Sequence, residues 1–502
     1  MKYMSTMDNM KSMCLSIMLV VLSFVGICQT MDGRIELEMR QGMRQPLVMP
    51  AKGYGLVMIE RSATNFLNQR ENIILSGYDT SMVKLWKHPI DYNERLDFVQ
   101  YEAYGQYAYL IFNHEGFEEI EEIRANISTG EIFRYSFKYF NHFSIQDFCA
   151  SGDRVYVAGL LKQLPIAIEL NLAANKIEAL PLPVDGKRVN IQDIYFSKSG
   201  DVMVSLAFEK ERRKVVMIKS YHQNGTNSEL IIEPIENYTL LNGKYTQLGT
   251  KSGIAIGTYS LGSNESTHGF YIGGYYEYQE VFKKYHSFGS LDNFFDFMSG
   301  KSQERMEEKI QKKEEKGKEL KTKYRLLVHD VLERKSDYVM VGEAYYPVYR
   351  TDRVKRYTAR GYYYENITVF DGYLYTHAVV VSFSKKGEIL WDHSFKIADT
   401  KLYYLRERVT ISRSNDKLTL LYPHEGKIHS MTVQNDKVLV SDKEIELNTG
   451  VEGDVVKQSS LGDSEFWYDH YFLTWGLQRI KNLEEDSDNK RRNVFYINKL
   501  SF

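Results

Sequence analysis

The chain has 502 residues, with 64 Lys and Arg against 66 Asp and Glu, so its formal net charge at pH 7 is only −2. That balance argues against a dedicated nucleic-acid-binding protein, which usually carries a basic excess. Aromatic residues make up 13% of the chain, including 38 Tyr, whereas Pro is scarce at 9; this composition favours β-strands over linkers and disorder.

The N-terminal segment has the pattern of a signal peptide. Lys11 precedes a twelve-residue apolar run, 14–25, which is too short to span a bilayer and is followed by GICQT. We therefore expect residues 1–28 to be a signal peptide that is cleaved after Cys28. Lipidation of Cys28 is the alternative, although Ile27 stands where a lipobox has a small residue. Either way, the protein is expected in the periplasm, on the outer-membrane surface or outside the cell.

The remaining chain, 29–502, is expected to form a single domain without a transmembrane segment or a disulfide framework. No second apolar run approaches eighteen residues, and only Cys149 lies beyond the signal. Cys149, in IQDFCASG, is expected to be buried on a strand.

Self-similarity is the main signal along this domain. A turn residue followed by an alternating apolar strand recurs at spacings of 50, 47, 48, 53, 83, 79 and 53 residues. The eight anchors of these units are Gly55, Gly105, Gly152, Gly200, Gly253, Ser336, Asn415 and Tyr468.

Most units continue with a hairpin, such as THAVVVSFSKKGEILWDHSFKI at 376–397, in which Gly387 suits a positive φ. Four strands in about 50 residues is the pattern of a β-propeller blade, and the hairpin would form its outer two strands. We expect a blade to start near each anchor. Separate β-sandwich domains are the alternative, but they would need linkers, and no Pro/Ser/Gly-rich linker appears in the sequence.

Eight units imply an all-β propeller of eight blades. Seven blades remain possible if the first and last units combine. The segment RIELEM, which begins at Arg34, is a candidate closing strand against NVFYINKLSF at the C-terminus.

The two long spacings indicate insertions. The first, at about 290–323, is expected to contain a charged helix over 302–323, because acidic and basic residues recur at i,i+4 and the apolar stripe is thin. The second, at about 345–375, holds nine Tyr and five basic residues in thirty-one positions. These tyrosines could pack the hairpin onto its own blade or form a binding surface, since Tyr is favoured at interfaces.

Four segments resemble a known family. KYRLLVHDV, GEAYYPVYR, FDGYLYTHAVVVSF and KGEILWDHSF, with the CQT ending of the signal, resemble a family of uncharacterised secreted β-propeller-like proteins of the Bacteroidota. The resemblance covers 294–397 well. It implies export and the propeller fold, but no activity, because none is assigned to the family.

Common catalytic signatures are missing from the sequence: it holds no HExxH, GxSxG, P-loop or CxxC motif. One constellation of polar residues could bind a ligand or a metal, or could satisfy buried hydrogen bonds; its members are His329, Glu343, Tyr345, Tyr346, Arg350 and His377. The spacings match no metal-ligand pattern, so no metal or cofactor is predicted. The predicted binding residues are Tyr345, Tyr346, Tyr349, Arg350, Tyr362, Tyr363, Tyr364 and His377.

Two classes of function are compatible with the propeller pattern, the insertions and the missing catalytic motifs. One is a non-catalytic binding or scaffold propeller at the cell envelope, as a subunit of an outer-membrane assembly or with another protein or glycan partner. The other is an enzyme that acts on glycans or small molecules through polar residues around the central channel. A propeller fold accommodates both, so the site must decide between them.

Overall fold

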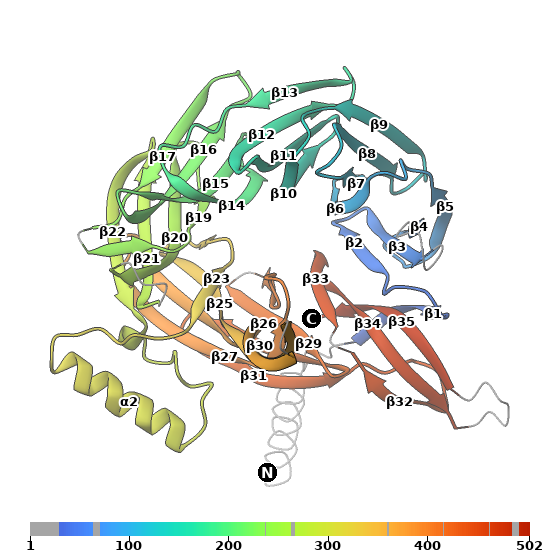
Figure 1. Ribbon diagram of the computed structural model, residues 1–502. Helices are drawn as coiled ribbons and strands as arrows, with labels where there is room; N and C mark the ends of the chain where they lie inside the picture. The colour runs from blue at the N-terminus through green and yellow to red at the C-terminus, as the bar shows by residue number, and fades with distance from the viewer. Residues whose placement is uncertain are drawn as a thin grey trace, which may run out of the picture.

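The computed structural model describes residues 30–63, 71–235, 237–262, 267–358, 361–414, 416–460, 462–483 and 491–502. The expected signal peptide, 1–28, lies outside the described residues. The described residues form eight antiparallel sheets of four or five strands, which follow one another in a ring around a central axis (Figure 1). The predicted all-β propeller fold is confirmed.

Sheets 1 to 4 each consist of four consecutive strands, whose order runs from the axis outward (Figure 1). Their bounds are, for sheet 1, β2 (Leu47–Ala51), β3 (Gly55–Ala63), β4 (Glu71–Tyr78) and β5 (Lys84–Ile90); for sheet 2, β6 (Asp97–Tyr104), β7 (Tyr107–Asn113), β8 (Glu119–Asn126) and β9 (Ile132–Lys138); for sheet 3, β10 (Phe143–Ser151), β11 (Arg154–Leu161), β12 (Leu164–Asn171) and β13 (Lys176–Leu180); and for sheet 4, β14 (Lys187–Phe196), β15 (Val202–Lys210), β16 (Arg213–Tyr221) and β17 (Asn227–Ile232).

In sheets 5, 6 and 8, two short strands share the innermost position. The bounds are, for sheet 5, β18 (Tyr238–Leu240), β19 (Lys244–Gln247), β20 (Ser252–Leu261), β21 (Gly269–Tyr276) and β22 (Gln279–Ser287); for sheet 6, β23 (Arg325–Val328), β24 (Leu332–Glu333), β25 (Asp337–Thr358), β26 (Gly361–Ser384) and β27 (Ile389–Leu402); for sheet 7, β28 (Thr410–Ser414), β29 (Lys417–His424), β30 (Lys427–Gln434) and β31 (Lys437–Glu446); and for sheet 8, β32 (Asp454–Ser459), β33 (Asp463–Tyr468), β34 (Tyr471–Asn482), β35 (Arg491–Ser501) and β1 (Thr30–Glu38).

The seven anchors within the described residues lie at or just before the second strand of their sheets, so a sheet begins one strand earlier than we expected. The eighth anchor, Asn415, lies outside the described residues. The second strand lies between two others and has both faces covered, which gives the longest apolar run. In sheet 2, for example, six of the seven residues of β7 are buried. In β6, on the axis side, all residues are half-buried or exposed, so its pattern is weaker.

Eight hydrophobic clusters lie between neighbouring sheets, one at each junction of the ring. The cluster between sheets 3 and 4 includes Cys149, which is 1% exposed, as expected for a buried strand residue. The hairpin 376–397 forms the outer strands β26 and β27 of sheet 6, and Gly387 has the predicted positive φ of 82°.

Strand β1 closes the ring from the other end of the chain. It pairs with β35 in the antiparallel register that places Arg34 opposite Asn498, so the predicted closing strand is confirmed. The Arg34 guanidinium donates to Asn498 Oδ1 at 3.1 Å and to Gln478 Oε1 at 2.8 Å. At the junction between sheets 8 and 1, the Trp467 indole N–H donates to the carbonyl of Gly55 at 2.9 Å.

The first insertion contains α2 (Lys301–Glu314), which ends nine residues before the predicted boundary, and it is preceded by the short 3₁₀ helix η1 (Phe288–Ser290). Beyond Gly317, whose φ is +62°, the chain is extended and packs inward. Leu320 is 3% exposed in the cluster between sheets 5 and 6. The Glu319 carboxylate accepts hydrogen bonds from two tyrosine hydroxyls of sheet 5, those of Tyr238 and Tyr259. Within the described residues, neither helix is long and apolar enough to cross a membrane.

Candidate functional site

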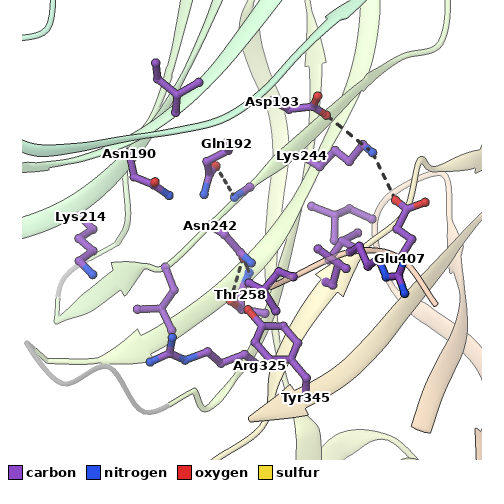
Figure 2. A pocket seen from close by; sticks show the side chains of 18 residues that line it. Asn190, Gln192, Asp193, Lys214, Asn242, Lys244, Thr258, Arg325, Tyr345 and Glu407 are labelled. Carbon is purple, nitrogen blue, oxygen red and sulfur yellow. Dashed lines mark hydrogen bonds and ion pairs between the residues drawn. The ribbon is translucent and has the colours of Figure 1, made fainter. Parts of the chain in front are cut away.

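A pocket of about 490 Å³ lies where the inner strands of sheets 4, 5 and 6 approach one another near the axis. We call it the axial pocket. Its remaining wall is the segment 405–407, which leads from sheet 6 to sheet 7. Figure 2 shows the polar side chains that point into it. They are Asn190, Gln192, Asp193, Lys214, Asn242, Lys244, Thr258, Arg325, Tyr345, Arg406 and Glu407.

Two side-chain amides form a fixed polar wall of the axial pocket. Asn242 Oδ1 accepts hydrogen bonds from the N–H and the hydroxyl of Thr258, at 2.7 and 2.8 Å. Asn242 Nδ2 donates to the carbonyl of Leu326 at 3.1 Å, and Gln192 Oε1 accepts the N–H of Gly243 at 3.1 Å. These bonds link sheets 4, 5 and 6, so the wall is organised before any ligand arrives.

Lys244 occupies one end of the axial pocket among three carboxylates. Its ammonium lies 3.2 Å from Asp330, 3.8 Å from Asp193 and 3.8 Å from Glu407. Burial opposes the charge of Lys244, but the carboxylates outweigh it and raise its pKa. In Figure 2, Lys214 and Arg325 lie away from this ion-paired end of the pocket.

Glu407 is held by a buried histidine behind the pocket wall. His329 Nδ1 lies 3.2 Å from Glu407, and its Nε2 lies 2.7 Å from Glu343. Burial alone would lower the pKa of His329, yet the two glutamates raise it to about 9. Burial likewise opposes ionisation of Glu407, and His329 and Lys244 reverse this and bring its pKa to about 2. The imidazolium of His329 and the carboxylate of Glu407 are therefore charged at neutral pH.

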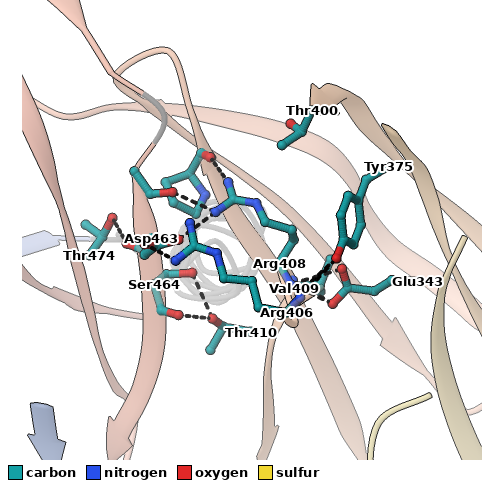
Figure 3. A network of polar contacts seen from close by, with 12 residues as sticks. Glu343, Tyr375, Thr400, Arg406, Arg408, Val409, Thr410, Asp463, Ser464 and Thr474 are labelled. Carbon is teal, nitrogen blue, oxygen red and sulfur yellow. Dashed lines mark hydrogen bonds and ion pairs between the residues drawn. The ribbon is translucent and has the colours of Figure 1, made fainter. Parts of the chain in front are cut away.

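The same network fixes the segment that forms the pocket's outer wall (Figure 3). Glu343 accepts the backbone N–H groups of Arg408 and Val409 at 2.9 Å. The Arg408 guanidinium donates to Asp463 at 2.7 Å, and Arg406 donates to the same carboxylate at 2.6 Å. Sheets 6, 7 and 8 are thus tied together beside the pocket.

Acidic side chains of the inner strands form a second cluster around the axis. Burial raises the pKa of Glu102, Asp147 and Glu465 to about 7 each, and Asp193 is raised as well. Glu102 keeps exposed surface, but surrounding protein limits the water around its carboxyl. Although these residues belong to sheets 2, 3, 4 and 8, they are close enough to raise one another's pKa.

None of these axial acids is among the binding residues predicted from the sequence, although the sequence carries a signal for two of them. The tripeptide Ile-Gln-Asp occurs in both β10 and β14, and a register shift falls within it in both strands. A β-bulge re-aims side chains, so an acid repeated at a bulge in the first strand of successive units indicates an axis-facing carboxylate. Asp147 also accepts the N–H of Ile194 at 3.1 Å, which ties sheet 3 to sheet 4.

The predicted binding residues are divided between the axial pocket, the core and a projecting hairpin. Tyr345 is 5% exposed and lines the pocket, where burial raises its pKa to about 12. Tyr346 is half-buried under the ammonium of Lys323, which lies 3.4 Å from the ring centroid. The other predicted binding residues except His377 are exposed on the hairpin; they are Tyr349, Arg350, Tyr362, Tyr363 and Tyr364.

His377 belongs to the core between sheets 5 and 6. Its ring stacks on Phe297 at 4.0 Å and contacts Phe294 at 4.7 Å, and burial lowers its pKa to about 3. It pairs with Ala344 in the strand register, whereas Glu343 pairs with Ala378, so His377 and Glu343 point to opposite faces of the sheet. The constellation is therefore split, and among the described residues no group of three or more His, Cys, Asp or Glu side chains is arranged to hold a metal ion.

Comparison with known proteins shows the fold alone. No family model matches the chain, and no curated protein matches it. Among solved structures, polysaccharide lyase Uly1 aligns over 94% of this chain and 99% of its own, with 9% identity and a TM-score of 0.43. The β-propeller domain of the Trilobed protease from Pyrococcus furiosus aligns over 79% of this chain and 97% of its own, with 7% identity and a TM-score of 0.36. The Dos1 propeller aligns over 79% and 89%, with 12% identity and a TM-score of 0.36.

Proposed function

We propose that this protein is an exported binding propeller whose axial pocket holds a polar ligand with an acidic group, such as a uronic or sulfated sugar. The pocket volume of about 490 Å³ is of the size that small-molecule sites have. Four cations and two acids line it. The observation that carries the proposal is this lining, in which cations outnumber acids beside a wall of amide side chains (Figure 2).

The amide wall suits hydroxyl groups, because Asn and Gln offer both donors and acceptors. A sugar ring also presents flat apolar patches, which suit the nearby Tyr345. The signal-peptide pattern supports a site of action at the cell envelope, with the protein free or as a subunit of an outer-membrane assembly. Resemblance to the secreted Bacteroidota family supports the same compartment.

The test is binding of galacturonate and of galactose, measured by calorimetry. We expect galacturonate to bind more tightly than galactose. Arg325→Gln or Lys214→Gln should weaken the affinity for galacturonate at least tenfold, since each removes a cation from the pocket. Arg213→Gln is the matched control, because Arg213 precedes Lys214 but is not part of the lining. Equal affinity for the two sugars, or equal binding by all variants, would contradict the proposal.

Cleavage of the same ligand is a second candidate function. It is favoured by two axial acids outside the pocket lining, Glu102 and Glu465, because burial raises their pKa values to about 7, which suits proton transfer at neutral pH. Release of shorter sugars from polygalacturonate incubated with the protein would distinguish this function from simple binding.

A further inference from the structure

The tyrosine-rich insertion is a two-stranded ribbon with two different faces. From Tyr349 to Phe370, β25 and β26 pair with each other and with no third described strand. Side chains opposite each other in an antiparallel pair lie on the same face. The register therefore places on one face, the aromatic face, Tyr349, Thr351, Arg353, Lys355, Tyr357, Tyr362, Tyr364, Asn366, Thr368 and Phe370. The opposite face carries Arg350, Asp352, Val354, Arg356, Tyr363, Glu365, Ile367 and Val369.

The charges of the ribbon are distributed unevenly between these faces. On the opposite face, Arg350 pairs with Asp352 at 3.0 Å and Arg356 with Glu365 at 2.9 Å. Both charged side chains of the aromatic face are cations, and they lie against tyrosine rings: Arg353 is 4.1 Å from the Tyr364 centroid, and Lys355 is 3.8 Å from that of Tyr362. The aromatic face thus combines exposed rings with positive charge.

A row of aromatic rings connects this face to the axial pocket. Tyr349 contacts Phe370 at 5.9 Å, and Phe370 contacts Tyr373 at 4.9 Å. Tyr373 in turn contacts Tyr345, which lines the pocket, at 5.6 Å. From Tyr345 to Tyr357 the strand rises about 40 Å, at roughly 3.3 Å per residue.

We propose that the aromatic face extends the axial pocket and binds a linear acidic polysaccharide whose end lies in the pocket. This inference rests on the proposed function. Tyrosine rings stack against the apolar faces of sugar rings, while Arg353 and Lys355 neutralise carboxylate or sulfate groups along the chain. An acidic protein strand is the competing occupant. It would pair through its main chain with the open ribbon edges, and that mode needs no row of rings leading into a pocket.

The test compares polygalacturonate with trigalacturonate, which is too short to reach the tip of the ribbon from the pocket. We expect the double variant Tyr362→Ala with Tyr364→Ala to bind polygalacturonate at least tenfold more weakly and to bind trigalacturonate with unchanged affinity. The thermal midpoint should also stay, because the two side chains are 59% and 50% exposed. The matched control is Tyr363→Ala, which removes a tyrosine of similar exposure, 52%, from the opposite face.

The outcomes separate this inference from the proposed function. If the double variant binds polygalacturonate as the unaltered protein does, while Arg325→Gln weakens both probes, the ribbon has no role and the pocket proposal stands. If Arg325→Gln changes the affinity for neither probe, the pocket proposal fails, and the inference that the ribbon extends the pocket fails with it. If poly-L-glutamate competes as well as polygalacturonate does, the ligand of the ribbon is an acidic protein segment and not a polysaccharide. If neutral dextran binds as tightly as polygalacturonate, charge has no role in recognition.

Discussion

At the scale of single residues, two buried histidines of one blade show how neighbours decide charge. His329 and His377 both lose water on folding, and burial alone lowers the pKa of both. His329 meets Glu343 and Glu407 and is charged at neutral pH, whereas His377 lies among aromatic rings and is neutral. Both were grouped in the sequence as one polar constellation, but only His329 belongs to the network beside the axial pocket.

The raised pKa of His329 predicts an alkaline loss of stability. Its folded value of about 9 exceeds the ordinary 6.5, so its contribution is complete below pH 6.5 and is lost as the pH rises through 9. We expect His329→Gln to lower the free energy of unfolding at pH 6 by about 2 kcal/mol, allowing for the partial exposure of Glu407. Chemical denaturation at pH 6 and pH 10 measures this, with exposed His88→Gln as control. A deficit that does not shrink at pH 10 would show that the imidazolium is not the stabilising form.

At the scale of elements, the first insertion has a peripheral part and an integral part. The helix α2 touches the core through the half-buried Met306 and Ile310. The extended segment after it buries Leu320 and Tyr324 between sheets 5 and 6. The charged composition of the whole insertion hid this division, because a few apolar residues in an extended segment have no helical periodicity to reveal them.

We expect the integral part to matter more for stability than the helix. Replacing 302–317 by a short Gly-Ser linker should leave the protein folded, with a loss of about 1 kcal/mol from its two half-buried side chains. Leu320→Ala should lower the free energy of unfolding by about 3 kcal/mol, because it leaves a cavity in a packed junction. Denaturant unfolding ranks the two variants. A larger loss for the linker variant would mean that α2 docks more firmly than its contacts indicate.

At the scale of the whole molecule, stability depends on ring closure. Every sheet packs against two neighbours, so no cluster can be removed without exposing the faces of two sheets. Sheet 8 is completed by β1 from the N-terminal end, which covers the outer edge of β35. An uncovered edge strand is a site for pairing with other chains.

Removing the closing strand should therefore destabilise the protein and promote association. Starting the chain at residue 39 instead of 30 removes the half-buried Met31, Ile35 and Leu37, which together contribute about 3 kcal/mol. We expect a lower thermal midpoint and concentration-dependent oligomers by light scattering, with the chain that starts at residue 30 as reference. An unchanged midpoint would show that the ring is stable without its closing strand.

The sequence by itself determined the propeller class, the eight units, the closing strand and the insertions. These features rest on local chemistry: apolar alternation, turn residues such as Gly387, and a period near 50 residues all act within one unit. The sequence also predicted where the tyrosine-rich insertion lies, but not which of its rings are buried in the core.

Only the tertiary structure decided the site. The axial pocket takes short runs of residues from parts of the chain that lie far apart in sequence, such as 190–193, 241–244 and 405–407, and only packing around the ring brings these runs together. The axial carboxylates likewise come from four different strands: Glu102 from β6, Asp147 from β10, Asp193 from β14 and Glu465 from β33. The register of β25 with β26 decided that Tyr362 and Tyr364 share a face with Arg353, while Tyr363 does not. Strand periodicity shows that neighbouring residues alternate, but pairing across the ribbon and packing around the ring determine which face meets the core, the pocket or solvent.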